Sequence, residues 1–98
     1  MQLKQQLEPL EQQIVNVLST IPEIGMIQAT QARTKWFITV SPLQMAQTDM
    51  AIFFHKVAMK MKQLPRNIKI DLIIWDGPEV CKLNENWGGV IFNREKTQ

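Results

Sequence analysis

The stretch 41–64, SPLQMAQTDMAIFFHKVAMKMKQL, is the part of the chain around which we expect the fold to be built. Ser41 is a residue type that caps helix starts, Pro42 suits the first helical position, and Gln44 completes a capping-box spacing. Pro65 follows the stretch, and the residue before a proline is disfavoured in helical geometry. Because no glycine or proline lies between Pro42 and Pro65, the pattern predicts one helix over the whole stretch, roughly 33 Å long.

Apolar residues recur on two opposite sides of this predicted helix. The first stripe has helical spacing and is expected to face the core: Leu43, Ala46, Met50, Phe53, Phe54, Val57, Met61 and Leu64. On the other side lie Met45, Ile52 and Met59, which follow one another at intervals of seven residues. The residues that flank this second stripe are basic or titratable: His55, Lys56, Lys60 and Lys62.

The second stripe admits two interpretations. An apolar centre with a charged rim is typical of a surface that binds another protein. Exposed apolar side chains are also normal on any protein surface, and another part of the same chain could cover them. We keep both interpretations as alternatives that a structure can separate.

Length and composition indicate one ordinary globular domain over residues 1–98, with residues 1–7 and 94–98 expected to fray. The single cysteine, Cys81, excludes an internal disulfide and a cysteine-rich zinc site, and it fits a reducing compartment. No apolar run is long enough to span a membrane, and the polar N-terminus does not resemble a secretory signal. We therefore expect a cytoplasmic protein that is not bound to a membrane.

The net charge of +2 is unevenly distributed. Residues 31–70 carry seven lysines and arginines against the single Asp49, whereas the rest of the chain carries four basic and eight acidic residues. A basic middle can attract phosphates or an acidic protein. It can equally pair with the acidic ends of its own chain.

The remaining segments predict a second helix and four strands. A helix is expected from near Pro9 to about Ser19, and strands are expected at 24–32, 35–40, 68–75 and 87–92. Helices and strands therefore follow the order α-β-β-α-β-β, which indicates the α+β class. We expect two helices packed on one face of a four-stranded, mostly antiparallel sheet. The other face would carry Phe37, Ile73 and Trp75, which is rather apolar for open solvent.

Patterns for catalysis, metals and cofactors are weak. His55 and Cys81 could act as base and nucleophile only if the fold brought them together. Asp76, Glu79 and Lys82 have a passing likeness to a nuclease site, but they lie in a predicted loop and not on a strand. No glycine-rich phosphate loop is present. We expect no enzyme activity, no metal site and no cofactor.

Nucleic-acid binding is the main alternative function. The candidate residues are basic or aromatic and belong to the middle of the chain: Arg33, Lys35, Trp36, Arg66 and Lys69. Cations would contact phosphates, and the aromatic rings of Trp36, Phe37 or Trp75 would stack on bases. Against this, the net charge is small and no RNA- or DNA-binding signature is present.

The function that we favour from the sequence is binding to another protein, as an accessory, regulatory or assembly factor. The predicted contact consists of Met45, Ile52 and Met59 with the rim of His55, Lys56, Lys60 and Lys62. Its basic rim predicts an acidic-rimmed partner and disfavours symmetric pairing through this patch. For a homodimer, the apolar sheet face or the first helix is the better candidate surface.

Overall fold

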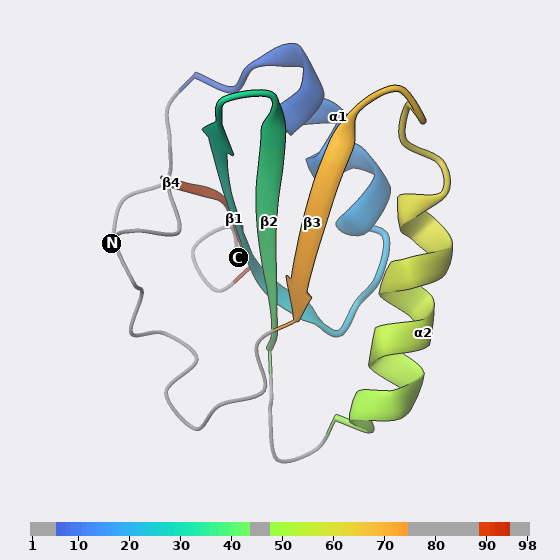
Figure 1. Cartoon of the computed structure of the whole chain (residues 1–98). Coiled ribbons are helices and arrows are strands. Elements are labelled where there is room, and N and C mark those ends of the chain that lie inside the picture. Colours follow the sequence, from blue (N-terminus) through green and yellow to red (C-terminus); the bar gives the residue numbers. More distant parts are fainter. Residues whose placement is uncertain (1–5, 44–47, 75–88, 95–98) are drawn as a thin grey trace.

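The computed structural model describes residues 6–43, 48–74 and 89–94. Its elements follow the predicted α-β-β-α-β-β order, which confirms the α+β class (Figure 1). Their bounds are α1 Pro9–Leu18, β1 Ile24–Ala32, β2 Lys35–Pro42, α2 Met50–Met61, β3 Lys69–Ile74 and β4 Gly89–Asn93.

The four strands form one sheet in the order β3-β2-β1-β4. β1 pairs antiparallel with both β2 and β4, whereas β2 and β3 are parallel. Parallel neighbours need a long crossover connection, and α2 with its flanking loops provides it between β2 and β3. The sheet is therefore mixed, with two antiparallel pairs and one parallel pair.

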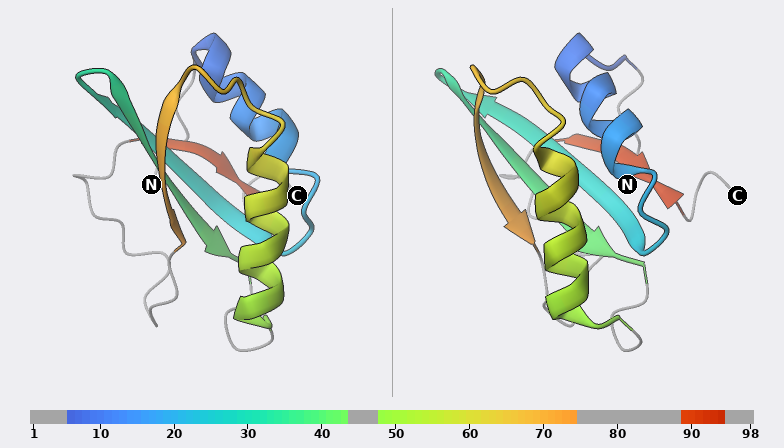
Figure 2. Two further views of the ribbon diagram at one scale, coloured as in Figure 1. Left: turned by 45° about the vertical axis from the view of Figure 1, so that its right-hand side comes forward. Right: turned by 90° about the vertical axis from the view of Figure 1, so that its right-hand side faces the viewer.

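Both helices lie on the same face of this sheet, as predicted (Figure 2). Alternate strand residues point toward them, so that Trp36, Ile38 and Val40 of β2 are buried. Between the helices and the sheet lies one hydrophobic core, made of Ile14, Leu18, Ile21, Ile24, Ile27, Ala29, Trp36, Ile38, Val40, Phe53, Val57, Leu64 and Ile91.

Helix α1 begins where the sequence indicates. Pro9 is its first residue, and Glu8 is the N-cap of a reciprocal capping box with Glu11. The Glu8 backbone N–H donates to Glu11 Oε1 at 2.9 Å, which satisfies one of the amides that a helix start leaves without a partner.

The central helix is much shorter than predicted. Ser41 and Pro42 do not cap it: both are buried at the end of β2, where Pro42 is paired with Ile24. Asp49 is the actual N-cap, because its Oδ1 accepts from the backbone N–H of Ala51 and Ile52 at 3.1 and 3.2 Å. The helix then runs only over the 12 residues Met50–Met61.

Pairing with β1 is the physical reason for this difference. A capping pattern at Ser41 competes with the backbone hydrogen bonds of a strand, and β1 supplies a partner along almost the whole of β2. Gly25 makes this close approach possible, since a Cβ there would lie 2.7 Å from the Cα of Leu43. Long-range pairing therefore overrides a local helix signal.

The C-terminal end of the described chain is anchored. Arg94 donates from Nε to the carbonyl of Ile24 at 2.8 Å, and from Nη2 to those of Ser19 and Ile21 at 3.0 and 3.1 Å. The expected fraying therefore does not begin at Arg94, while residues 95–98 lie outside the described chain. No helix among the described residues is long and apolar enough to cross a membrane.

Candidate functional site

The solvent-facing side of α2 carries two large apolar residues that the sequence had placed there. Ile52 is 53% exposed and Met59 is 49% exposed. They stand seven residues apart and so project from the same side of the helix. We call this pair the α2 outer patch. Met45, the third member of the predicted stripe, lies outside the described residues.

The buried side of the same helix explains the orientation of the patch. Phe53 and Val57 are fully buried against the sheet, and Met50 and Met61 pack around them. At 100° per residue, Ile52 and Met59 then point away from the core. Within the described part of the chain, no segment buries these two side chains.

The rim of the patch is basic but differs from the prediction at one position. His55 and Lys62 are exposed and Lys60 is partly exposed. Lys56 instead points its ammonium at the carboxylate of Glu23, in the connection between α1 and β1, and forms an ion pair with it. Part of the basic middle of the chain therefore does pair with the chain's own acidic residues.

This ion pair gives stability a pH dependence of known sign. The hydrogen bond from Lys56 lowers the pKa of the Glu23 carboxyl below its ordinary value. A carboxyl whose pKa is lower in the folded state stabilises the fold above its unfolded pKa of about 4.3. That contribution is lost as the pH falls through the folded pKa.

We expect Lys56→Met to lower the free energy of unfolding by about 0.2–1 kcal/mol at pH 7, the range measured for exposed ion pairs. The difference from the wild type should shrink toward zero near pH 3. Urea unfolding at both pH values measures it, with Lys60→Met as the matched control on the same helix. An unchanged difference at the two pH values would contradict the assignment to Glu23.

Phe54 is a surface residue that the sequence had assigned to the core. It is 57% exposed, whereas the adjacent Phe53 is completely buried. Consecutive residues on a helix point 100° apart, so only one of two neighbouring phenylalanines can point directly at the sheet. Two adjacent phenylalanines in a helix indicate that one of them is less buried than the other. The predicted core stripe was too wide to separate them and included both.

A groove runs between α2 and the edge strand β3. It has a volume of about 610 Å³ and is lined by Ala58, Met61, Lys62, Leu64, Pro65, Arg66, Ile68, Ile70 and Leu72. Its walls are mainly apolar, and the charged residues among the described lining are Lys62 and Arg66. The sequence pattern placed Ile68, Ile70 and Leu72 on one face but did not reveal that α2 leaves them partly open.

The predicted nucleic-acid residues are divided between two surfaces. Lys35 and Lys69 are aligned in the parallel pairing of β2 and β3, on the sheet face opposite the helices. Arg33 lies in the adjacent hairpin turn with a positive φ of 58°, and Arg66 lies in the loop before β3. Trp36 is 7% exposed and faces the core, so its ring is not available for stacking, and this part of the prediction is wrong.

The sheet face opposite the helices nevertheless has an aromatic ring near these cations, although Gln28 and Thr39 on the same face are buried. Phe37 is partly exposed, and Lys35 Nζ lies 6.0 Å from its ring centroid. Lys35 also forms a 3.1 Å ion pair with Asp71 of β3. Ile73 on the same face is 37% exposed, while Trp75, the third apolar residue predicted there, lies outside the described residues.

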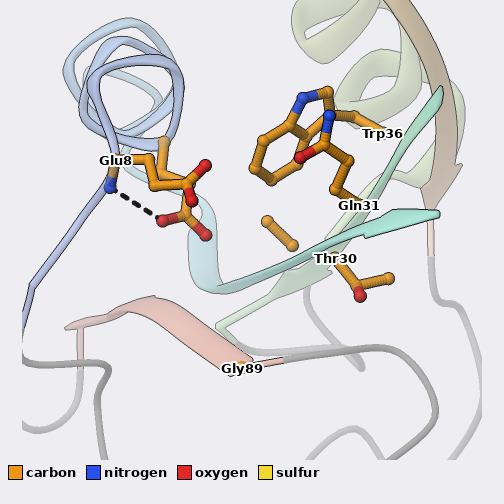
Figure 3. A pocket seen from close by; sticks show the side chains of 7 residues that line it. Glu8, Thr30, Gln31, Trp36 and Gly89 are labelled. Carbon is orange, nitrogen blue, oxygen red and sulfur yellow. Dashed lines mark hydrogen bonds between the residues drawn. The ribbon is translucent and has the colours of Figure 1, made fainter. Parts of the chain in front are cut away.

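A second pocket, of about 450 Å³, lies between the start of α1 and the sheet (Figure 3). Figure 3 shows Glu8 on one side of it and the indole of Trp36 on the other. Glu11 also lines the pocket, but it is buried and its carboxylate accepts from the Glu8 backbone N–H. The capping box therefore accounts for this carboxylate pair without a ligand.

The residues considered for catalysis and metal binding are not assembled in the described part of the chain. Asp71 pairs with Lys35, and His55 stands alone on the exposed side of α2. Within residues 6–43, 48–74 and 89–94, no three His, Cys, Asp or Glu side chains form a metal-binding group. Asp76, Glu79, Cys81 and Lys82 lie outside these residues.

Comparison with known proteins identified no relative of this chain. No protein-family model, curated protein or solved structure matches the chain. The arrangement itself defines a small α+β domain with a hairpin, a β-α-β unit and one helix-covered sheet face.

Proposed function

We propose that this protein is a non-enzymatic accessory or regulatory factor that binds another protein through the α2 outer patch. The observation that supports it is the exposure of Ile52 and Met59, each about half, on the side of α2 that points away from the core. A helix in a small domain needs one apolar side for its own fold. This one carries a second apolar side.

The energetics favour a partner over a solvent-exposed resting state. Full burial of an isoleucine or methionine side chain is worth about 1.5–3 kcal/mol, so burying the exposed half of each would contribute roughly 1 kcal/mol. Methionine is flexible and polarizable, and it adapts to different partner surfaces. The two residues would form the apolar centre of a larger contact.

The charges around the patch define the chemistry of the partner. Lys62 is exposed and Lys60 partly so, and neither forms an ion pair within the part of the chain that the structure describes. A partner with acidic residues around an apolar centre would complement them. A second copy docked through the same patch would bring lysines against lysines, so a homodimer would use a different surface.

Ile52→Glu tests this proposal. Because Ile52 is exposed, we expect the variant to stay folded, with an unfolding midpoint close to that of the wild type, but to lose a protein that co-purifies with the wild type. Ala51→Glu is the matched control: it adds the same charge to the neighbouring exposed residue, about 100° away around the helix. Affinity purification with mass spectrometry and a urea titration give the two readouts.

Two results would overturn the proposal. If Ile52→Glu unfolds the protein, the residue belongs to the core. If the folded variant retains every partner of the wild type, the patch is not the contact.

A second candidate function is the binding of single-stranded nucleic acid by the sheet face opposite the helices, at the end where Lys35 and Lys69 lie. The specific observation in its favour is that Lys35 and Lys69 are aligned across β2 and β3 next to the partly exposed ring of Phe37. The ion pair between Lys35 and Asp71 weakens it, since it lowers the positive charge there. Titration with single-stranded oligonucleotides decides: absence of binding at about 50 mM salt would remove this candidate, because phosphate contacts are strongest at low salt.

We place the proposed activity in the cytoplasm. The single cysteine in 98 residues suits a reducing compartment and leaves no disulfide to form within the chain. A fractionation of cells that express the protein tests this placement.

A further inference from the structure

Strand β3 is at one end of the sheet, and none of the described strands occupies its outer edge. It is parallel to β2 on one side, and no described strand pairs with its other side. An edge strand presents backbone N–H and C=O groups in the geometry that a further strand needs. Six residues, Lys69–Ile74, offer an edge of about 20 Å.

The helix layer does not fully cover this end of the sheet. Ile38 and Val40 on the helix side of β2 are completely buried, whereas Ile70, Leu72 and Ile74 on the same side of β3 are only partly buried. In Figure 1, α2 lies beside β3 at this end of the sheet. The apolar α2–β3 groove occupies the space between them.

The groove and the strand edge are adjacent, so one ligand can use both. A strand added to β3 would place alternate side chains on the helix side of the sheet. There they would enter the groove and contact Ala58 and Met61 of α2 as well as Ile70 and Leu72 of β3. The remaining side chains of the added strand would lie beside Asp71 and Ile73, on the sheet face opposite the helices.

The described charged residues that line the groove are both basic, Lys62 and Arg66. On the opposite face of the sheet, β3 carries Lys69 and also Asp71, whose carboxylate is paired with Lys35. None of the three cations Lys62, Arg66 and Lys69 has a carboxylate partner among the described residues. Among the residues that the structure describes, no acidic side chain lines the groove. An occupant that carries aspartate or glutamate near one end would complement this rim.

We infer that the β3 edge binds an extended acidic segment of a partner protein by strand addition, with alternate apolar side chains of that segment in the α2–β3 groove. Backbone hydrogen bonds to β3 would supply affinity, and the groove would select the side chains. A helix would fill the groove but leave the amides of the edge unpaired. This site is separate from the α2 outer patch, and its success or failure does not depend on that proposal.

The experiment uses a displayed library of random 12-residue peptides and the full chain as bait. We expect enriched peptides to alternate apolar with other residues over about six positions, the length of β3, and to carry acidic residues at one end. Synthetic peptides with an enriched sequence should slow hydrogen exchange at the β3 amides. A scrambled peptide of the same composition should bind at least tenfold more weakly.

Ala58→Arg tests the groove directly. The arginine places a long side chain in the groove from a helical position that tolerates it. We expect the Kd for a synthetic peptide with an enriched sequence to rise at least tenfold. Ala51→Arg is the matched control on the same helix, since Ala51 does not line the groove. Its Kd should stay within twofold of the wild type.

Several outcomes would overturn this inference. Peptides without alternation, or a Kd unchanged by Ala58→Arg, would remove the groove as the binding site. A dimer mass in light scattering that Ala58→Arg reduces to a monomer would make a second copy the occupant. Binding of oligonucleotides that competes with the peptides would assign the site to phosphates.

Discussion

Phe53→Ala should lower the free energy of unfolding by about 3–5 kcal/mol, the loss measured when a fully buried phenylalanine is truncated in a core. Phe53 is the largest fully buried side chain among the residues that the structure describes, and it belongs to the core between α2 and the sheet. Domains of this kind have a total stability of about 5–15 kcal/mol, so this one change removes a large share of it. Urea unfolding followed by tryptophan fluorescence and circular dichroism measures the effect.

Phe54→Ala is the matched control, because it deletes the same side chain one position further along. More than half of Phe54 is already exposed, so we expect a loss below about 1 kcal/mol. Similar losses from the two truncations would mean that the helix is rotated so that both rings contact the core, as the sequence pattern suggested. A larger loss of unfolding free energy from Phe54→Ala than from Phe53→Ala would mean that Phe54, and not Phe53, is the buried residue of α2.

Arg94→Met should have the second largest effect, a loss of about 2–4 kcal/mol, since hydrogen bonds from a charged donor contribute about 1.5–3 kcal/mol each and are not additive. The guanidinium donates to three backbone carbonyls: Ser19, Ile21 and Ile24. Ser19 is the C-cap of α1, where a cation also opposes the negative end of the helix dipole. The Arg94 side chain therefore holds the end of β4 against the segment between α1 and β1.

Two further variants separate this geometry from a general charge effect. Arg94→Lys keeps the charge but has no planar fork, so it should recover only part of the loss. Arg66→Met removes an exposed arginine for which the described structure shows no hydrogen bond or ion pair, and it should change stability by less than about 0.5 kcal/mol. Equal small losses from Arg94→Met and Arg66→Met would show that the three carbonyl contacts add little.

The proposed protein contact and the inferred strand-addition site use different sides of α2. Ile52 and Met59 point to solvent, whereas Ala58 and Met61 line the groove beside β3. Lys62 is the rim residue that the two sites share. Variants at position 52 and at position 58 should therefore have independent effects, and a change at Lys62 should weaken both.

Local patterns predicted the parts of the fold that depend on near neighbours. Pro9 indicated the start of α1, and the alternation from Lys35 to Val40 indicated β2 with its buried face. The seven-residue interval between Ile52 and Met59 predicted that they share the side of α2 opposite the core. Each of these features follows from a periodicity or a cap within a few residues.

Features that depend on distant segments were not predicted. The helix-start pattern at Ser41 was overridden because β1 offers Pro42 a strand partner, so the cap moved to Asp49. Lys56 pairs with Glu23 across a separation of 33 positions in the sequence, and Lys35 pairs with Asp71 across 36 positions. Only the folded chain brings these partners together. The same holds for Arg94, which was expected to fray.

By itself, the amino-acid sequence determined the order of helices and strands, the α+β class and the second apolar side of α2, because periodicity and capping act within one element. Only the tertiary structure decided where α2 begins, which of two adjacent phenylalanines is buried and which lysines keep a free charge. It also decided that β3 is an edge strand with an open groove beside it. These features depend on which segments contact one another in the folded chain. Burial, strand pairing and desolvation arise from those long-range contacts and not from any local segment.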